Sequence, residues 1–335
     1  MDGAILERVV TRGSVELHLW TGGPESGPVV VLTHGGSMDH RMWEKQVSVL
    51  FPRYRVLTYD MRGHGLSVCG PSEFSPRAAA EDLVAILDAV EVEDAVLVGH
   101  SLGGTISQVV ALEHPQRVRA FAGIGCACIT MRPSLAMRVF ARFGPAMSRR
   151  RGPARMREDT AKRAGVTVET QEYARLAAGA MDDEMFEAQA SVSFGDYANV
   201  PGYHIGVPLL LLRGAKDGYG FLLSSAPKWA RRDGGEFVLV PNAAHNAGQD
   251  NPEFVNDRLI RFLERGQGLT ECANKRINAE KHFTPLHLCT SRKDALYSRL
   301  GWHSAGRTTA DGKQATVMTN HVEQRHPPDG ALRCR

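Results

Sequence analysis

The chain has 335 residues, and its 40 lysine and arginine residues nearly balance its 37 aspartate and glutamate residues, for a formal net charge of +3. This balance gives no indication of a nucleic-acid partner. No apolar stretch approaches the about 20 residues that span a bilayer, and the first residues lack the apolar core of a signal peptide. The six cysteines are scattered, which is typical of a reducing compartment. We therefore expect a cytoplasmic protein with neither a nucleic-acid nor a membrane partner.

The first segment with chemical content follows a short apolar run. Residues 28–32 predict a buried strand that leads into Thr33-His34-Gly35-Gly36-Ser37. A backbone N–H in this loop, with that of Gly36 the best candidate, could bind an oxyanion. His34 has two interpretations. We favour an interior residue that hydrogen-bonds the loop backbone, because a second base has no evident task, and a contact to the substrate is the alternative.

A second strand, expected over Ala95–Val98, runs into Gly99-His100-Ser101-Leu102-Gly103, and a helix-compatible stretch follows. A sharp turn from strand to helix holds the central serine in a strained conformation with its hydroxyl exposed, and glycines permit the close crossing. The N–H of Leu102, at the start of the helix, would bind the same oxyanion as that of Gly36. A glycine-rich turn with an incidental serine is the alternative.

The region from about residue 131 to residue 205 indicates a helical insertion. Its first part, 132–163, is rich in arginine and methionine, and apolar residues recur at helical spacing in 173–194. Two interpretations stay open, a solvated helical face with methionines packed beneath it and a mobile lid over the site. Four side chains are candidate substrate contacts, with plain core packing as the alternative for each: Met137, Phe140, Met181 and Met185.

A nucleophilic serine needs a base and an orienting carboxylate, and both follow later strands. Residues 207–212 predict a strand whose exit loop carries Asp217, and residues 236–240 predict one whose exit loop carries His245. Because ligands bind at the carboxyl ends of parallel strands, we expect Ser101, Asp217 and His245 to converge there. A turn aspartate and a surface histidine are the alternatives. Two rival acids follow no strong strand: Asp196 and Asp250.

A helix expected over 251–264 should close the domain that contains these strands. The segment 267–335 that follows has a different composition. It is polar and histidine-rich, which favours a disordered extension, and the histidine spacing indicates no zinc site. Arg265-Gly266-Gln267-Gly268 and Tyr297 weakly resemble the second half of a GNAT-type acetyltransferase, in which such a loop opens a helix and holds coenzyme A. The first half of that fold is absent, so a remnant is expected rather than a working acetyltransferase.

The chain resembles the α/β-hydrolase superfamily over about residues 14–265. Five ordered elements carry the resemblance: His34-Gly35-Gly36, Asp60 to Ser67, Gly99 to Gly104, Gly214 to Asp217, and His245. The resemblance implies an α/β fold with a mostly parallel eight-stranded sheet flanked by helices, a helical cap and a C-terminal extension. It places the core at 1–130 and 206–266, the cap at 131–205 and the extension at 267–335. It also implies a structural role for Arg62 and His64.

The function implied is that of a serine hydrolase, which cleaves a small carboxylic ester or lactone through an acyl-enzyme on Ser101, without cofactor or metal. Haloalkane dehalogenases and soluble epoxide hydrolases carry aspartate at the position of this serine, so the chain differs from them. A carbon–carbon bond hydrolase or a cofactor-free haloperoxidase-like enzyme would use the same triad. A non-catalytic receptor for a small ligand is the alternative from another class.

Overall fold

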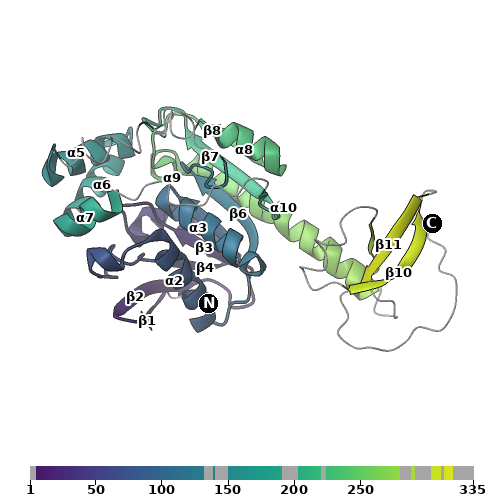
Figure 1. Ribbon diagram of the computed structural model, residues 1–335. Coiled ribbons are helices and arrows are strands. Elements are labelled where there is room, and N and C mark those ends of the chain that lie inside the picture. Colours follow the sequence, from purple (N-terminus) through teal and green to yellow (C-terminus); the bar gives the residue numbers. More distant parts are fainter. Residues whose placement is uncertain are drawn as a thin grey trace. The chain divides into compact units, whose positions relative to one another are not determined.

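The computed structural model describes residues 5–131, 139, 150–190, 203–219, 224–279, 288–290, 303–310 and 313–319, with side chains up to residue 265. The chain divides into two units, Met1–Gly266 and Gln267–Arg335. Figure 1 shows the first unit as a sheet with helices on both faces. Within the described residues, no helix combines the length and apolarity needed to cross a membrane.

The first unit is built on an eight-stranded sheet with the strand order β1-β2-β4-β3-β5-β6-β7-β8. The pairs β1–β2 and β2–β4 are antiparallel, whereas every pair from β4 to β8 is parallel. The predicted mostly parallel eight-stranded sheet is therefore confirmed. The strands are β1 (Leu6–Arg12), β2 (Val15–Gly22), β3 (Val29–Thr33), β4 (Arg55–Tyr59), β5 (Ala95–His100), β6 (Val118–Ile124), β7 (Leu209–Gly214) and β8 (Glu236–Val240).

Helices cover both faces of this sheet, which explains why its central strands are continuous apolar runs. Successive residues of a strand point to opposite faces. Val31 accordingly packs in one core with side chains of α2, α3 and α8, and Val30 packs in a second core with α1 and the start of α10. The helices that flank the sheet are α1 (Glu44–Leu50), α2 (Pro76–Ala89), α3 (Leu102–Glu113), α8 (Ala226–Asp233) and α10 (Pro252–Ala279).

Among the described residues between β6 and β7, three helices form what we call the helical insertion. They are α5 (Pro153–Ala164), α6 (Val168–Ala180) and α7 (Asp183–Ala190), and they lie together beside the sheet (Figure 1). Buried alanines of α5 and α6 pack in the core on the α1 side of the sheet, among them Ala161 and Ala174. The insertion is therefore packed on the sheet domain through its small side chains.

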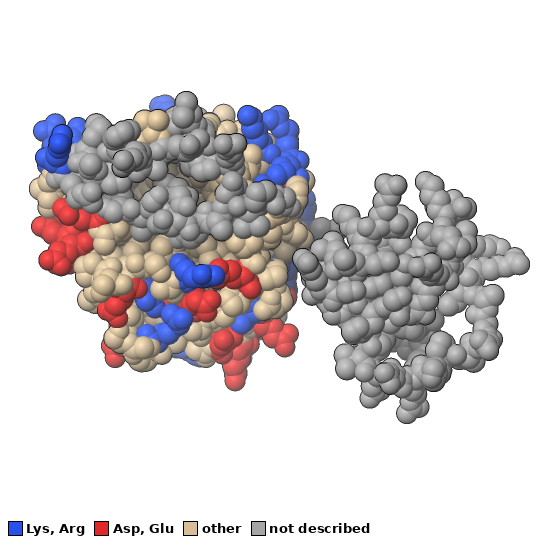
Figure 2. Space-filling view, viewed as in Figure 1, with Lys and Arg blue, Asp and Glu red and all other residues tan. Residues whose placement is uncertain are grey.

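Charged groups of both signs are interspersed on the face of the first unit that Figure 2 shows. Many charged side chains of the first unit pair across elements, as Arg117 does with Asp88 at 2.6 Å and Arg53 with Glu264 at 2.6 Å. Exposed pairs of this kind contribute at most about 1 kcal/mol each, so the buried cores account for most of the stability of the unit.

The second unit contains regular secondary structure within its described residues. The helix expected over 251–264 continues to Ala279, and the unit contains a three-stranded antiparallel sheet with the order β10-β11-β9. Its strands are β9 (Leu288–Thr290), β10 (His303–Ala310) and β11 (Lys313–Thr319). Arg265 to Gly268 lie inside α10, where backbone N–H groups bond to the preceding turn. These residues therefore do not open a helix, as the coenzyme A loop of a GNAT-type acetyltransferase does.

Candidate active site

Ser101 lies at the tight turn between β5 and α3. Its backbone has φ 50° and ψ −112°, in the left-handed half of conformational space that non-glycine residues rarely adopt. A Cβ on Gly99 would lie 2.5 Å from the carbonyl oxygen of Gly103, and a Cβ on Gly103 would overlap backbone oxygens of Thr33 and His34. Glycine is therefore required on both sides of Ser101, and the turn presents the serine hydroxyl at the carboxyl end of the sheet.

The structure brings Ser101, His245 and Asp217 into one chain of hydrogen bonds. The Nε2 atom of His245 is 3.0 Å from Oγ of Ser101, and its Nδ1 atom is 2.9 Å from Oδ2 of Asp217. The carboxylate can only accept, so Nδ1–H donates to Asp217 and leaves Nε2 free to accept the serine proton. The three residues come from the exits of β5, β7 and β8, which end at the same edge of the sheet.

The electrostatics of Asp217 favour its ionised form. The side chain has no solvent exposure. Burial alone would raise the pKa of this carboxyl, but the hydrogen bond and the charge of His245, together with the backbone N–H of Tyr219, outweigh burial and lower the pKa. That N–H donates to Oδ1 at 2.8 Å. Asp217 thus stays charged near neutral pH and holds the imidazole in one tautomer.

His100 supports the loop of His245 in a way that the sequence analysis did not anticipate. Its buried ring lies 4.8 Å from the ring of His245, and its Nε2–H donates to the carbonyl oxygen of His245 at 3.0 Å. Burial, and then the neighbouring charge of His245, lower the pKa of His100 to about 3, so the ring is neutral. The only signal in the sequence was its place directly before Ser101.

Gly36 lies against the side chain of Leu102, and these are the two residues expected to provide the oxyanion donors. Leu102 is the first residue of α3, and its N–H has no acceptor within the helix. A Cβ on Gly36 would lie 3.5 Å from Cδ2 of Leu102 and would overlap Oε1 of Gln189, a residue of α7. The Nε2 of Gln189 donates to Oγ of Ser37 at 2.6 Å. The loop after β3 is thus in contact with the helical insertion, through a glutamine that the sequence analysis missed.

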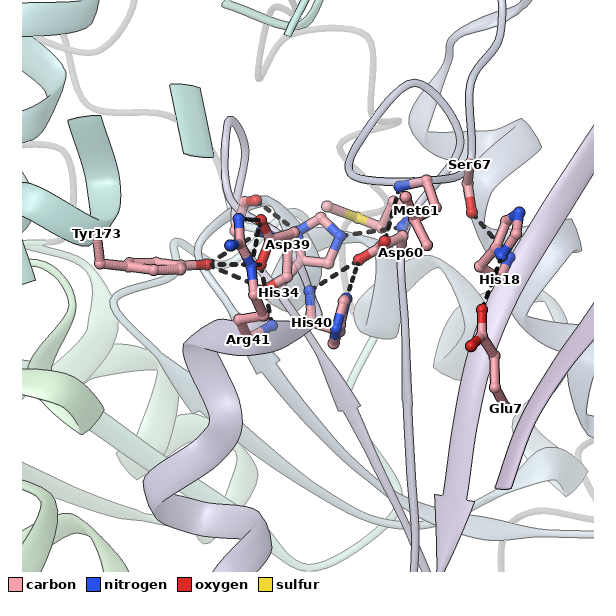
Figure 3. Close-up of polar contacts among 12 residues, drawn as sticks. Glu7, His18, His34, Asp39, His40, Arg41, Asp60, Met61, Ser67 and Tyr173 are labelled. Atoms are coloured by element: carbon pink, nitrogen blue, oxygen red, sulfur yellow. Dashed lines mark hydrogen bonds and ion pairs between the residues drawn. The ribbon is translucent and has the colours of Figure 1, made fainter. Parts of the chain in front are cut away.

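His34 is fully buried and has both ring nitrogens occupied (Figure 3). Its Nδ1 atom is 2.8 Å from the carbonyl oxygen of Gly35, and its Nε2 atom accepts from the N–H of Met61 at 3.0 Å. Burial lowers the pKa of the imidazole, so it is neutral. The geometry favours the interpretation of His34 as an interior residue that joins two loops, and it leaves no ring nitrogen to hydrogen-bond a substrate.

The loop over residues 60–67 is held by buried carboxylates. Oδ1 of Asp60 accepts from the backbone N–H and Nδ1 of His40, and its Oδ2 accepts from the N–H of Leu66 (Figure 3). The guanidinium of Arg62 bonds both oxygens of buried Asp82 at 2.5 and 2.6 Å. These contacts use Arg62 to anchor the loop to α2, as expected for a structural residue.

The proposed substrate contacts in the insertion have different surroundings. Met185 is 3% exposed and packs on the loop of residues 60–67, since a Cβ on Gly63 would lie 2.7 Å from its Cε. Met181 is half-buried, and its carbonyl oxygen accepts from Arg157 at 2.7 Å. Met137 and Phe140 lie outside the described residues. Tyr219, not anticipated, packs edge-on to His245 with ring centres 4.8 Å apart.

Within the described residues, one group of side chains has the spacing of a metal site: Glu81, Glu113 and His114. His114 pairs with Glu81 at 3.0 Å, and Glu113 pairs with Arg77 at 2.5 Å, so these groups already have partners. The group lies at the far end of the 12-residue α3 from Ser101, about 18 Å along the helix. It therefore takes no part in the site around Ser101.

Comparisons with known proteins agree with this architecture. A sequence model described as alpha/beta hydrolase fold matches residues 28–252. The chain is similar to 3-oxoadipate enol-lactonase 1 of Acinetobacter baylyi, with 38% identity over 96 residues, 29% of this chain and 36% of that protein. It is also similar to an epoxide hydrolase of Caballeronia sordidicola, with 32% identity over 133 residues, 39% of this chain and 40% of that protein. The aligned segments thus span less than half of these two relatives.

Among solved structures, a thermophilic esterase from Thermogutta terrifontis superimposes with a TM-score of 0.66. The match covers 78% of this chain and 99% of the esterase at 23% identity. At that identity the likeness concerns the fold.

Proposed function

We propose that this chain, which belongs to the alpha/beta hydrolase fold family, is a serine hydrolase that cleaves a small carboxylic ester or lactone through an acyl-enzyme. The observation that carries the proposal is the hydrogen-bonded chain from Oγ of Ser101 through His245 to Asp217, at 3.0 and 2.9 Å. The backbone strain at Ser101 supports it, because such strain persists where the surrounding structure enforces it and is common at active sites.

In the proposed reaction, His245 takes the proton of Ser101 as the serine oxygen attacks the carbonyl carbon. The carbonyl π electrons move to the oxygen, and the N–H groups of Leu102 and Gly36 bind this oxyanion, each lowering the barrier by about 2.7–4 kcal/mol. The oxyanion then collapses, the bond to the leaving oxygen breaks, and protonated His245 gives its proton to that oxygen. Water, deprotonated by His245, releases the acid in the same two steps.

The resemblances support an ester or lactone as the substrate class. The enol-lactonase relative and the esterase neighbour are named for such substrates, whereas the epoxide hydrolase relative is not. Ser101 separates this chain from epoxide hydrolases, which carry aspartate at the equivalent turn. A location in the cytoplasm is part of the proposal, and the free thiols of Cys69, Cys126 and Cys128 support it.

The proposal is tested by pre-steady-state kinetics on chromogenic esters, followed by a panel of lactones and dienoate carbon–carbon substrates. For esters whose acyl-enzyme is hydrolysed more slowly than it forms, we expect a burst of the alcohol product equal to the enzyme concentration. Turnover of the dienoates with none of the esters would favour a carbon–carbon bond hydrolase. Binding of panel compounds without turnover of any would favour the receptor interpretation.

A further inference from the structure

Asp250, the residue that ends the short α9 helix (Ala247–Asp250), lies between the loop of His245 and the helical insertion. Its Oδ2 accepts from the backbone N–H of Ala244, directly before His245, at 2.8 Å. The same carboxylate accepts from the N–H groups of Val166 and Thr167, at 3.0 to 3.2 Å, in the turn between α5 and α6. One side chain therefore holds the insertion together with residues 243–246, the loop that carries His245 and that we call the histidine loop.

A second contact joins the same two segments on the other side of His245. The N–H of Asn246 donates to the carbonyl oxygen of Ala164, the last residue of α5, at 2.7 Å. The residues before and after His245 are thus both bonded, directly or through Asp250, to residues 164–167. The histidine loop cannot keep all of these bonds if this turn moves away from the sheet.

Every partner of the Asp250 carboxylate is a hydrogen-bond donor. Besides the three backbone N–H groups, the hydroxyl of Thr167 donates to Oδ1 at 3.2 Å. Only an ionised carboxylate offers acceptors both to the insertion and to the histidine loop. Oδ2 accepts from both Ala244 and Val166, whereas Oδ1 accepts from Val166 and Thr167. Asparagine has the same shape but a single acceptor oxygen, so it either loses the bond to Ala244 or turns its N–H₂ group toward the N–H of Thr167.

We propose that Asp250 is a positioning residue that couples the docking of the helical insertion to the position of His245. The inference rests on the proposed serine hydrolase function, and it makes the insertion part of the catalytic apparatus rather than only a cover for the pocket. When the turn of residues 164–167 is docked, His245 is held at hydrogen-bond distance from Ser101. When the turn moves away from the sheet, Asp250 loses its bonds to Val166 and Thr167. It then no longer fixes the N–H of Ala244, and His245 is released.

The test compares the wild-type chain with Asp250→Asn and with a matched control, Glu169→Gln. Glu169 of α6 pairs with Lys45 of α1 at 3.4 Å, which is another contact between the insertion and the sheet domain, but an exposed one that involves neither Asp250 nor residues 243–246. We expect kcat of Asp250→Asn on an ester to fall at least tenfold with KM changed less than threefold, because displacement of a catalytic group by about 1 Å can cost 10²-fold. Glu169→Gln should keep kcat within twofold.

Hydrogen–deuterium exchange of the full chain provides a readout that does not depend on activity. In Asp250→Asn, amides of residues 243–246 and of residues 164–167 should both exchange at least fivefold faster, whereas Glu169→Gln should leave residues 243–246 unchanged. If Asp250→Asn fails to fold, Thr167→Val, which lacks the hydroxyl bonded to Oδ1, should give a smaller rise in both segments. Unchanged exchange in 243–246 together with kcat within twofold would overturn the coupling. If the wild type has no esterase activity but the two segments still loosen together, the proposed function fails and the coupling stands.

Discussion

Replacement of Asp217 by asparagine is the most informative single change to the site, because it preserves shape and reverses the hydrogen-bond pattern. In the wild type, Oδ1 accepts from the N–H of Tyr219 at 2.8 Å and Oδ2 accepts from Nδ1 of His245 at 2.9 Å. Asparagine has one acceptor oxygen. If that oxygen stays with Tyr219, the N–H₂ group faces Nδ1 and favours the tautomer with the proton on Nε2. That proton then points at Ser101, and His245 cannot accept from it.

The expected loss is large because the whole base function depends on this tautomer. In a well-studied serine protease, the same substitution lowers kcat about 10⁴-fold, and we expect a loss of that order here. A 10⁴-fold loss corresponds to about 5.4 kcal/mol in activation free energy. Ser101→Ala should lower kcat at least as much, and the double variant should lose little more, since members of a triad act as a unit.

The assay is steady-state hydrolysis of the best ester or lactone found in the panel, with near-ultraviolet circular dichroism to show that Asp217→Asn retains its tertiary packing. Asp250→Ala serves as a comparison: it should lower kcat by a smaller factor than Asp217→Asn, because Asp250 contacts the backbone of Ala244 and not the imidazole. A kcat for Asp217→Asn within tenfold of wild type would refute the reasoning. It would mean that another group orients His245.

Three further predictions concern the same region. Gly103→Ala should lower the unfolding free energy by about 1–3 kcal/mol and kcat about 100-fold, because its Cβ would press on the backbone oxygens of Thr33 and His34. Urea unfolding and ester hydrolysis measure the two effects. An unchanged kcat would contradict the close contact between α3 and the loop after β3. Met185→Ala should cost about 2–5 kcal/mol in urea unfolding, and a simultaneous rise in KM would make Met185 a pocket residue as well as a packing one. Because the pKa of Asp217 is lowered in the folded state, the stabilisation that its ionised form provides is present above the ordinary carboxyl pKa near 4 and is lost as pH falls through the folded value. Between pH 5 and 2, the midpoint of thermal unfolding should therefore fall more steeply for the wild type than for Asp217→Asn. Equal slopes would contradict this prediction.

The sheet and the meeting of the three polar residues were accessible from the sequence for a physical reason. Strands buried on both faces are continuous apolar runs, and the loops after them must lie at one edge of a parallel sheet. Ser101, Asp217 and His245 each follow such a run directly. Their convergence therefore needs only the strand assignments and the parallel topology, and no knowledge of side-chain packing.

Contacts that depend on packing across long stretches of chain were not accessible. Gln189 reaches Ser37 from the helical insertion, and Asp250 reaches Thr167 across 83 residues. No local pattern indicates such pairs, because the positions of the insertion helices follow from small buried side chains such as Ala161 rather than from a motif. Asp250 was considered only as a rival acid for His245, whereas its carboxylate bonds backbone groups on both sides.

The tail shows the opposite error, in which a local pattern was given too much weight. Gly266 and Gly268 suggested a loop, since glycine disfavours a helix interior by about 1 kcal/mol relative to alanine. The helix α10 nevertheless continues through both to Ala279. A penalty of this size is small beside the hydrogen bonds of a helix that is already nucleated and packed through Val255 and Leu259.

The most direct test of the proposed nucleophile is intact-mass analysis of the full chain after incubation with a fluorophosphonate, for wild type and Ser101→Ala in parallel. The strained turn and the hydrogen bond to His245 at 3.0 Å predict a single adduct on the wild type and none on the variant. An equal adduct on both proteins would place the reactive group elsewhere. Absence of an adduct on folded wild type would contradict an activated serine at position 101.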